Sequence, residues 1–437
     1  METSAQKLHK VLLASTIGGS ETGDRLGQEA VDAFTLYVKN AMSGNAEVKD
    51  LTLLRSKVSL NSIIASAKMV FDTKETAVFL KVHIEANTSG QSVLGDDKEY
   101  ANAKLLETAG WPILSPLTKN IDPNYPLLVY PNIQTLSFFN LIEESYADEN
   151  KITPPLLVIF NETQKNIGSA TLPTLKESST REAQNAPVQT LFLKRFKEGG
   201  RVDDWYRDET IFALPGLLEP IAWNVLKNAK WSINSTLFEK TLAEIINSAR
   251  NSLAYTGEEK SFTVISHGDD HSGNMFIDEK SALLFDPAFA GENPVALSET
   301  KALAHIGYMI MGGMYFDPKL KTAAFRFDSE KNIIFAEVDF NSTPLYKEHE
   351  KIARTIIDAR ILPLFKEAAR MGASMPKEVQ RLQDALSGCP LLTINIPKLL
   401  DTKDGRGTGL LPLVIMLNQM TGLPSLEYLK DELSKLK

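Results

Sequence analysis

The sequence predicts an α+β protein built from two units, a small β-rich N-terminal unit over residues 1–130 and a larger, mainly helical unit over residues 131–437. The chain of 437 residues exceeds the roughly 150 residues that one domain usually holds. Residues 48–85 are rich in β-branched and aromatic side chains with partial alternation, which indicates strands. Beyond Pro131 the apolar residues mostly follow helical spacing.

The composition limits the partners and the compartment. Apolar residues make up 43% and charged residues 23% of the chain, as is typical of soluble globular proteins. The formal net charge of −8 would repel a phosphate backbone, so no nucleic-acid partner is expected. The apolar run at residues 11–19 is too short to span a membrane, and the early acid Glu2 argues against a signal peptide. With Cys389 as the single cysteine, we expect a cytoplasmic protein.

The elements of the N-terminal unit follow from local pattern. Three strands are expected first, at residues 51–56, 62–72 and 76–84. The polar triplet at residues 73–75 fits a hairpin turn between the second and the third. A helix is predicted over residues 97–110, because Asp97 suits its N-cap and Gly110 its end. A further apolar strand at residues 126–130 ends before Pro131.

The C-terminal unit is predicted to hold most of the helices. They are expected at residues 136–146, 154–170, 212–230 and 236–255, and again at the C-terminal end of the chain. The polar stretch 171–187 between them is interpreted as a loop. Short strands are predicted at residues 262–266, 274–278 and 282–286, with a turn at 279–281, followed by a hairpin at 323–340.

One short segment carries most of the chemistry. Residues 266–276 read "SHGDDHSGNMF" and lie between two predicted strands. Asp269 precedes Asn274 by five residues, and Asp286 follows twelve residues later, after a strand. A carboxylate at Asp269 can accept a hydroxyl proton, while the Asn274 oxygen and the Asp286 carboxylate bind a divalent cation. These are the groups that phosphoryl transfer requires.

The stretch "HGDDHSGNMFID...ALLFDPAFAG" resembles the catalytic loop of the aminoglycoside phosphotransferase and choline kinase-like families. This resemblance implies a bilobal protein-kinase-like fold. It also implies that Asp269 is the catalytic base, that Asn274 and Asp286 are magnesium ligands, and that His267 is a buried support of the loop.

A kinase-like fold also needs a strand lysine paired with a helix glutamate upstream of this loop. Lys81 and Glu99 meet this requirement and are eighteen residues apart. Lys81 lies in the apolar run 79–82, where an unpaired ammonium group would be costly. We therefore favour a functional role for Lys81 over an exposed position at a strand edge.

Two segments resemble the nucleotide-binding parts of the same families. Residues 55–67 resemble the phosphate-positioning turn, where Ser59, Asn61 and Ser62 offer hydrogen-bond donors. That segment contains no glycine, which departs from the family pattern and restricts close backbone approach to phosphate. The stretch "LLVYPNI" resembles the linker between lobes, whose backbone at Tyr130 and Asn132 would hold adenine.

The acceptor side is less defined by the sequence. Asp270 occupies a position that is usually apolar in these families, so it meets either a cationic substrate or, as we favour, a surface lysine. Asp204 and Glu209 belong to an acidic segment at residues 198–209 that suits a cationic or polyhydroxylated substrate. A solvated acidic loop is the more common explanation for such a segment.

Together these patterns favour ATP-dependent, magnesium-assisted phosphorylation of a hydroxyl group on a small molecule, with GTP as the other candidate nucleotide. An atypical protein kinase is less favoured, because the predicted return to helix near Ala296 leaves little room for peptide docking. A nucleotide-binding pseudokinase stays open because of the missing glycines. A zinc hydrolase using His267 and His271 is the least favoured, since the remaining histidines are isolated and His305 lies in a helical run typical of a core. The acceptor and the oligomeric state are not predicted.

Overall fold

The computed structural model describes two compact units. The first contains residues 1–104 and 113–135, and the second contains residues 105–112 and 136–437. The residues described within them are 28–54, 62–71, 73–83, 98–122, 124–132, 136–147, 152, 154–257, 260–277, 281–311, 323–342, 345–401 and 407–436. No helix in these described ranges combines the length and the apolar character needed to cross a bilayer.

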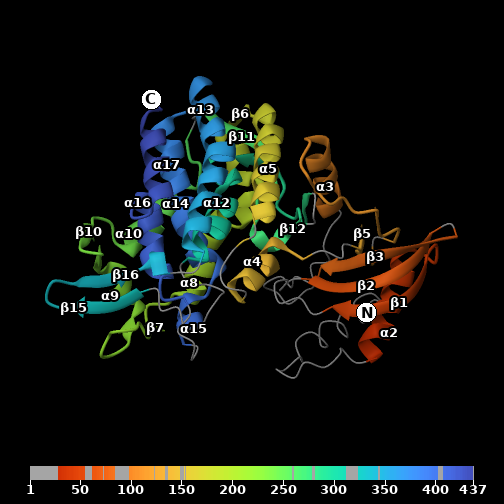
Figure 1. The fold of residues 1–437 in the computed structure, drawn as a ribbon, viewed down its shortest axis with the longest axis horizontal. Helices are drawn as coiled ribbons and strands as arrows, with labels where there is room; N and C mark the ends of the chain where they lie inside the picture. Colours follow the sequence, from red (N-terminus) through yellow and green to blue (C-terminus); the bar gives the residue numbers. More distant parts are fainter. Residues whose placement is uncertain are drawn as a thin grey trace. The chain divides into compact units, whose positions relative to one another are not determined.

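The first unit is an antiparallel sheet with a helix packed against it (Figure 1). Its strands follow the order β1-β2-β3-β5-β4, with bounds β1 Glu47–Leu54, β2 Ser62–Phe71, β3 Lys74–His83, β4 Thr118–Lys119 and β5 Leu128–Pro131. Helix α2 (Gln28–Ala41) places Phe34, Tyr37 and Val38 in the core that covers one face of this sheet. Helix α3 spans Lys98–Thr108.

Strand β3 lies between β2 and β5, and its alternation sorts its side chains. Leu80 and Val82 are buried in the core shared with α2. Lys81 therefore points to the opposite face, from the middle of the sheet. The β2–β3 hairpin turns tightly, because Phe71 pairs with Lys74 and Thr73 adopts a left-handed φ of 78°. The predicted strands of this unit and the helix that ends before Gly110 are confirmed over the described residues. The turn predicted at residues 73–75 is placed too late, because Lys74 and Glu75 already belong to β3. The predicted N-cap residue Asp97 lies outside the described residues.

The second unit is mainly helical. Its α-helices are α4 (Phe138–Ala147), α5 (Pro154–Thr171), α6 (Thr180–Asn185), α7 (Leu193–Phe196), α8 (Arg201–Trp205), α9 (Trp223–Asn228), α10 (Leu242–Ser252), α11 (Val295–Ser298), α12 (Tyr346–Ile356), α13 (Leu362–Arg370), α14 (Met375–Thr393), α15 (Ile396–Leu400), α16 (Leu410–Gln419) and α17 (Pro424–Ser434). Figure 1 shows α5, α12 and α17 side by side. Helix α16 packs on α14 and is apolar on all sides, as expected for a helix at the centre of a core.

Two segments of this unit are π-helical, η4 (Ala302–Met309) and η6 (Ile357–Ile361). Single 3₁₀ turns occur at η1 (Leu172–Thr174), η2 (Pro187–Thr190), η3 (Ser272–Asn274) and η5 (Phe340–Ser342). Such π-helical stretches are rare and are frequently found at functional sites.

The strands of the second unit form small sheets. Strand β11 (Lys260–Ser266) lies between β6 (Lys176–Ser179) and β14 (Gly291–Pro294), β12 (Met275–Ile277) pairs with β13 (Ala282–Leu284), and β7 (Ile211–Phe212) pairs with β8 (Ile221–Ala222). A separate four-stranded sheet has the order β10-β9-β16-β15, with bounds β10 Thr236–Phe238, β9 Lys230–Ile233, β16 Ile333–Val338 and β15 Ala323–Asp328. The hairpin predicted at residues 323–340 is confirmed.

Three predictions for this unit are wrong in part. The predicted loop 171–187 contains β6, a polar edge strand paired with β11, and the capped helix α6. The predicted helix 212–230 is mostly strand and turn, because Pro215, Gly216 and Pro220 interrupt its apolar spacing and only α9 forms. The predicted helix 236–255 begins only at Leu242, where a capping box between Thr241 and Glu244 fixes its start.

Candidate functional site

The loop between β11 and β12 is held in one conformation by backbone and histidine contacts. Gly268 has a φ of 79°, and a Cβ atom there would lie 2.6 Å from the Phe289 carbonyl oxygen, so a side chain would not fit. His267 is fully buried. Its Nδ1 accepts the Asp269 N–H at 3.4 Å, and its Nε2 therefore carries the proton and donates to the Phe285 carbonyl at 3.0 Å. His267 thus ties the loop to the segment that leads into Asp286.

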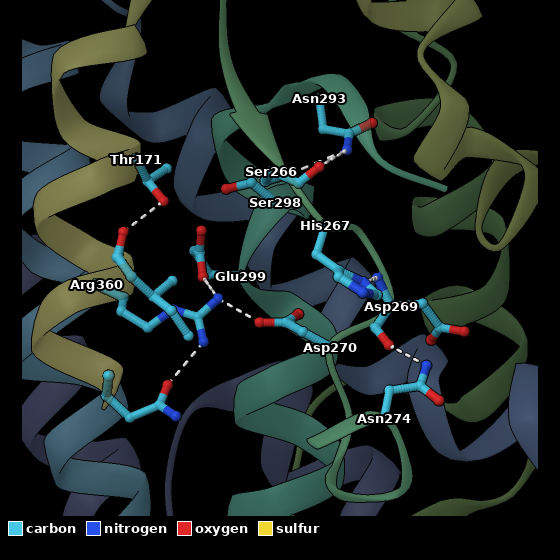
Figure 2. A network of polar contacts seen from close by, with 12 residues as sticks. Thr171, Ser266, His267, Asp269, Asp270, Asn274, Asn293, Ser298, Glu299 and Arg360 are labelled. Atoms are coloured by element: carbon cyan, nitrogen blue, oxygen red, sulfur yellow. Dashed lines mark hydrogen bonds and ion pairs between the residues drawn. The ribbon is translucent and has the colours of Figure 1, made fainter. Parts of the chain in front are cut away.

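The predicted base Asp269 and the predicted metal ligand Asn274 lie on this loop (Figure 2). Asp286 follows strand β13 of the neighbouring hairpin. Asn274 donates its amide nitrogen to the Asp269 carbonyl at 2.9 Å, so its amide oxygen is the atom that it can offer to a cation. The Phe285 N–H donates to the Asn274 carbonyl at 2.8 Å, which places Asp286 directly after a residue bound to the loop. Asp286 itself has a φ of 62°, a strained conformation for a residue with a side chain.

The charges of the Asp269 and Asp286 carboxylates both act on His271. Burial lowers the pKa of His271, and the charges of Asp269 and Asp286 oppose that shift. Amide and carboxylate oxygens are the donors that hard cations such as Mg²⁺ prefer, so Asn274 and Asp286 fit that ion chemically. Within the described ranges, no group of three or more His, Cys, Asp or Glu side chains is arranged to hold a metal ion.

Asp270, the residue after the predicted base, lies in a different environment. Its side chain is fully buried and forms an ion pair with Arg360 from η6. The same guanidinium group pairs with Glu299 and donates to Gln164 Oε1 at 2.7 Å (Figure 2). The predicted surface lysine is therefore wrong, and a buried arginine takes its place. Because this ion pair is completely buried, Asp270 is not accessible to a substrate.

In the Arg360 cluster, the carboxyl groups of Asp270 and Glu299 share one guanidinium group. Burial raises the pKa of Glu299 to about 7, with the neighbouring Asp270 charge raising it further and Arg360 opposing. Arg360 is almost completely buried and also lies over the Trp111 ring, 5.6 Å from its centroid. Local sequence patterns do not predict this cluster, because its charged members lie on segments far apart in the chain.

Lys301 is a site residue that the sequence reading missed. Only 3% of Lys301 is exposed, and its Nζ lies 3.7 Å from Asp269 Oδ1. The Nζ atom also donates to Thr393 Oγ1 at 3.0 Å and lies 3.3 Å from His305 Nε2. The available signal was a lysine at the start of the apolar run "ALAHIGYMI", where a buried ammonium group needs partners.

In the first unit, Lys81 and Glu99 form a buried ion pair. Lys81 Nζ lies 3.0 Å from Glu99 Oε1 and 2.9 Å from Oε2. Tyr130 donates its hydroxyl group to Glu99 Oε1 at 2.6 Å. The sequence reading expected only the Tyr130 backbone to matter, so its phenol group is an additional contact. These three side chains come from β3, α3 and β5.

The remaining predicted site residues are placed as follows. The Asn132 N–H donates to the Ala77 carbonyl at 3.2 Å and is thus already used within the sheet. Ser62 is the first residue of β2, whereas Ser59 and Asn61 lie outside the described residues. Asp204 in α8 and Glu209 in the following turn are exposed, and their contact with a substrate stays a prediction.

Searches with the sequence found no matching family model and no matching curated protein. The structure is similar to solved structures of small-molecule kinases, each at 12% identity. A choline kinase from Cryptosporidium parvum Iowa II has a TM-score of 0.36 and covers 93% of this chain and 94% of its own. An amicoumacin kinase in complex with AMP-PNP, Ca²⁺ and Ami has a TM-score of 0.44, and the match covers 91% of this chain and 97% of that one. A choline/ethanolamine kinase family protein from Mesorhizobium loti has a TM-score of 0.41, and the match covers 93% of this chain and 99% of that one. The likeness is remote, and the function must be inferred from the chain's own residues.

Removing Arg360 should strongly destabilise the second unit. In Arg360→Met, Asp270 and Glu299 stay buried without their cation, which typically costs about 3–5 kcal/mol of unfolding free energy. Urea unfolding at pH 7 measures this loss. Arg370→Met is the matched control, because the exposed Arg370–Glu367 pair should contribute little to stability. Equal stability losses in the two variants would contradict the assignment.

Glu299 should make stability depend on pH. Its folded pKa of about 7 lies above the ordinary value of 4.5, so its contribution is fully present below pH 4.5 and is lost as the pH rises through 7. Glu299→Gln should remove this component and flatten the fall in unfolding free energy between pH 4.5 and pH 7. Urea unfolding of both proteins across that window tests the slope, and parallel pH curves would refute the role of Glu299.

Proposed function

We propose that this chain is a kinase that transfers the γ-phosphoryl group of ATP to a hydroxyl group of a small molecule. The observation that supports this proposal is a chain of hydrogen bonds: Asn274 donates to the Asp269 carbonyl, and Phe285, the residue before Asp286, donates to the Asn274 carbonyl. His267 adds contacts to the Asp269 N–H and to the Phe285 carbonyl.

In this reaction the acceptor hydroxyl gives its proton to the Asp269 carboxylate. The acceptor oxygen then forms a bond to the γ-phosphorus, and the bond from that phosphorus to the bridging oxygen breaks to release ADP. Asn274 and Asp286 would hold Mg²⁺, which neutralises phosphate charge when bound. Because little covalent chemistry falls to the protein, positioning of the hydroxyl group by Asp269 is its main contribution.

The first unit contributes a phosphate contact. Lys81 is held by both oxygens of Glu99, which orients its ammonium group within the apolar run at residues 79–82. Tyr130 fixes the Glu99 carboxylate in turn. We assign Lys81 to the α- and β-phosphates of the nucleotide and Glu99 and Tyr130 to its support.

Asp269→Asn should keep nucleotide binding and lose turnover. Loss of the base should lower kcat by about two to four orders of magnitude, with little change in the KM for Mg-ATP. ADP release in the presence of amino alcohols, sugars, nucleosides and aminoglycosides provides the measurement, and GTP in place of ATP tests the nucleotide. Asp431→Asn, an exposed change on α17, is the control. Wild-type turnover in Asp269→Asn would remove Asp269 from this role.

Substitution of Lys81 should weaken nucleotide binding. Loss of a hydrogen bond to a charged group should raise the Kd for Mg-ATP by about tenfold to a hundredfold. The double variant Lys81→Met/Glu99→Leu avoids a buried unpaired carboxylate, and Lys68→Met on the neighbouring strand removes an exposed lysine as the control. Titration calorimetry measures the Kd, and an unchanged value in the double variant would contradict the assignment.

A nucleotide-binding module without turnover is the second candidate, favoured by the glycine-free segment at residues 55–61. It predicts normal Mg-ATP binding together with an ADP release rate that does not depend on Asp269. The same two assays therefore separate it from the kinase.

A further inference from the structure

Lys301 and Asp269 face each other across a short gap. The distance from Lys301 Nζ to Asp269 Oδ1 is 3.7 Å, which is too long for a hydrogen bond. Asp269 Oδ1 is a buried atom that has no hydrogen-bond partner among the residues that the structure describes. An acceptor atom and an ammonium group thus stand opposite each other without a direct bond.

An oxygen atom to one side of this pair can lie within hydrogen-bonding distance of both groups. A hydroxyl oxygen placed about 2.8 Å from both groups would donate its proton to Asp269 Oδ1 and accept a hydrogen bond from Lys301. Asp269 Oδ1 thereby gains a hydrogen-bond donor, and the Lys301 ammonium gains a further acceptor. Because a carboxylate accepts only and an ammonium donates only, a hydroxyl or a water molecule is the kind of group that satisfies both at once.

The Lys301 ammonium is fixed by its other contacts. It donates to Thr393 Oγ1 at the end of α14 and lies 3.3 Å from His305 Nε2 in the π-helical segment η4. Burial lowers the pKa of His305 well below its usual value, and the charge of Lys301 lowers it further, so the imidazole is neutral and its Nε2 accepts from the ammonium. The buried lysine is therefore oriented toward Asp269 before any substrate binds.

We propose that Lys301 is a second catalytic residue, whose ammonium contacts the acceptor oxygen while Asp269 takes the proton; this inference rests on the proposed kinase function. Lys301 keeps its three protons throughout. The proton of the hydroxyl group moves to Asp269 Oδ1, the acceptor oxygen bonds to the γ-phosphorus, and the bridging oxygen leaves with ADP. The positive charge of Lys301 offsets the negative charge that develops on the attacking oxygen.

Hydrolysis of Mg-ATP without any acceptor tests the catalytic role, because water then occupies the place of the hydroxyl group. Lys301→Met should lower kcat by about a hundredfold to a thousandfold, with the KM for Mg-ATP within about threefold of the wild-type value. Lys301→Arg should retain part of the lost rate, since it keeps the charge. Lys366→Met, which removes an exposed lysine on α13, should leave hydrolysis unchanged.

A structural role for Lys301 would give a different result. It would lower the yield and thermal stability of Lys301→Met but leave kcat per folded molecule intact, and that outcome would overturn the inference. If Lys301→Met does not fold, Thr393→Val decides, because it removes the hydroxyl that holds the ammonium. It should lower kcat by about tenfold, and a wild-type rate in this variant would overturn the inference.

The outcomes also separate this inference from the proposed function. Hydrolysis that depends on Asp269 but not on Lys301 overturns the inference alone, whereas hydrolysis that depends on neither overturns both.

Discussion

The conformation of the loop after β11 depends on two buried cations that hold two consecutive aspartates. Lys301 lies beside Asp269, and Arg360 is paired with Asp270. Lys301 and Arg360 thus contact neighbouring residues of the same loop. Removing Arg360 would leave Asp270 and Glu299 buried without their cation, which costs more than the ion pairs themselves contribute to stability. The loop is therefore fixed by charge as well as by packing.

The same physical rule organises the first unit. Lys81, Glu99 and Tyr130 form a buried network from two strands and a helix, in which the Lys81 ammonium and both Glu99 carboxylate oxygens have partners. Buried polar networks of this kind gain strength from the low local dielectric and lose it sharply when one member is removed. In both units the charged side chains are thus placed by partners from other elements before a ligand arrives.

Some of this arrangement could be predicted from the sequence and some could not. The strands of the first unit and the Lys81–Glu99 pair were predictable, because an ammonium group in an apolar strand needs a nearby acid. The same reasoning would have predicted that Lys301 needs a partner. Helical patterns alone, however, do not show which loop a helix faces, so they do not identify Asp269 as its neighbour. The pairing of Arg360 with Asp270 could not be predicted, because the two residues are 90 positions apart and a local pattern carries no information on such pairing. The error at residues 212–230 came from apolar spacing that outweighed two prolines and a glycine.

The two aspartates differ in role because their surroundings differ. Asp270 is completely buried, shares Arg360 with Glu299, and lies in a cluster where burial raises the pKa of Glu299 to about 7. The Asp269 side chain is 19% exposed, and its Oδ1 has no direct hydrogen bond to Lys301. Of the two adjacent acids, only Asp269 therefore keeps an exposed surface, because burial and the ion pair with Arg360 enclose Asp270.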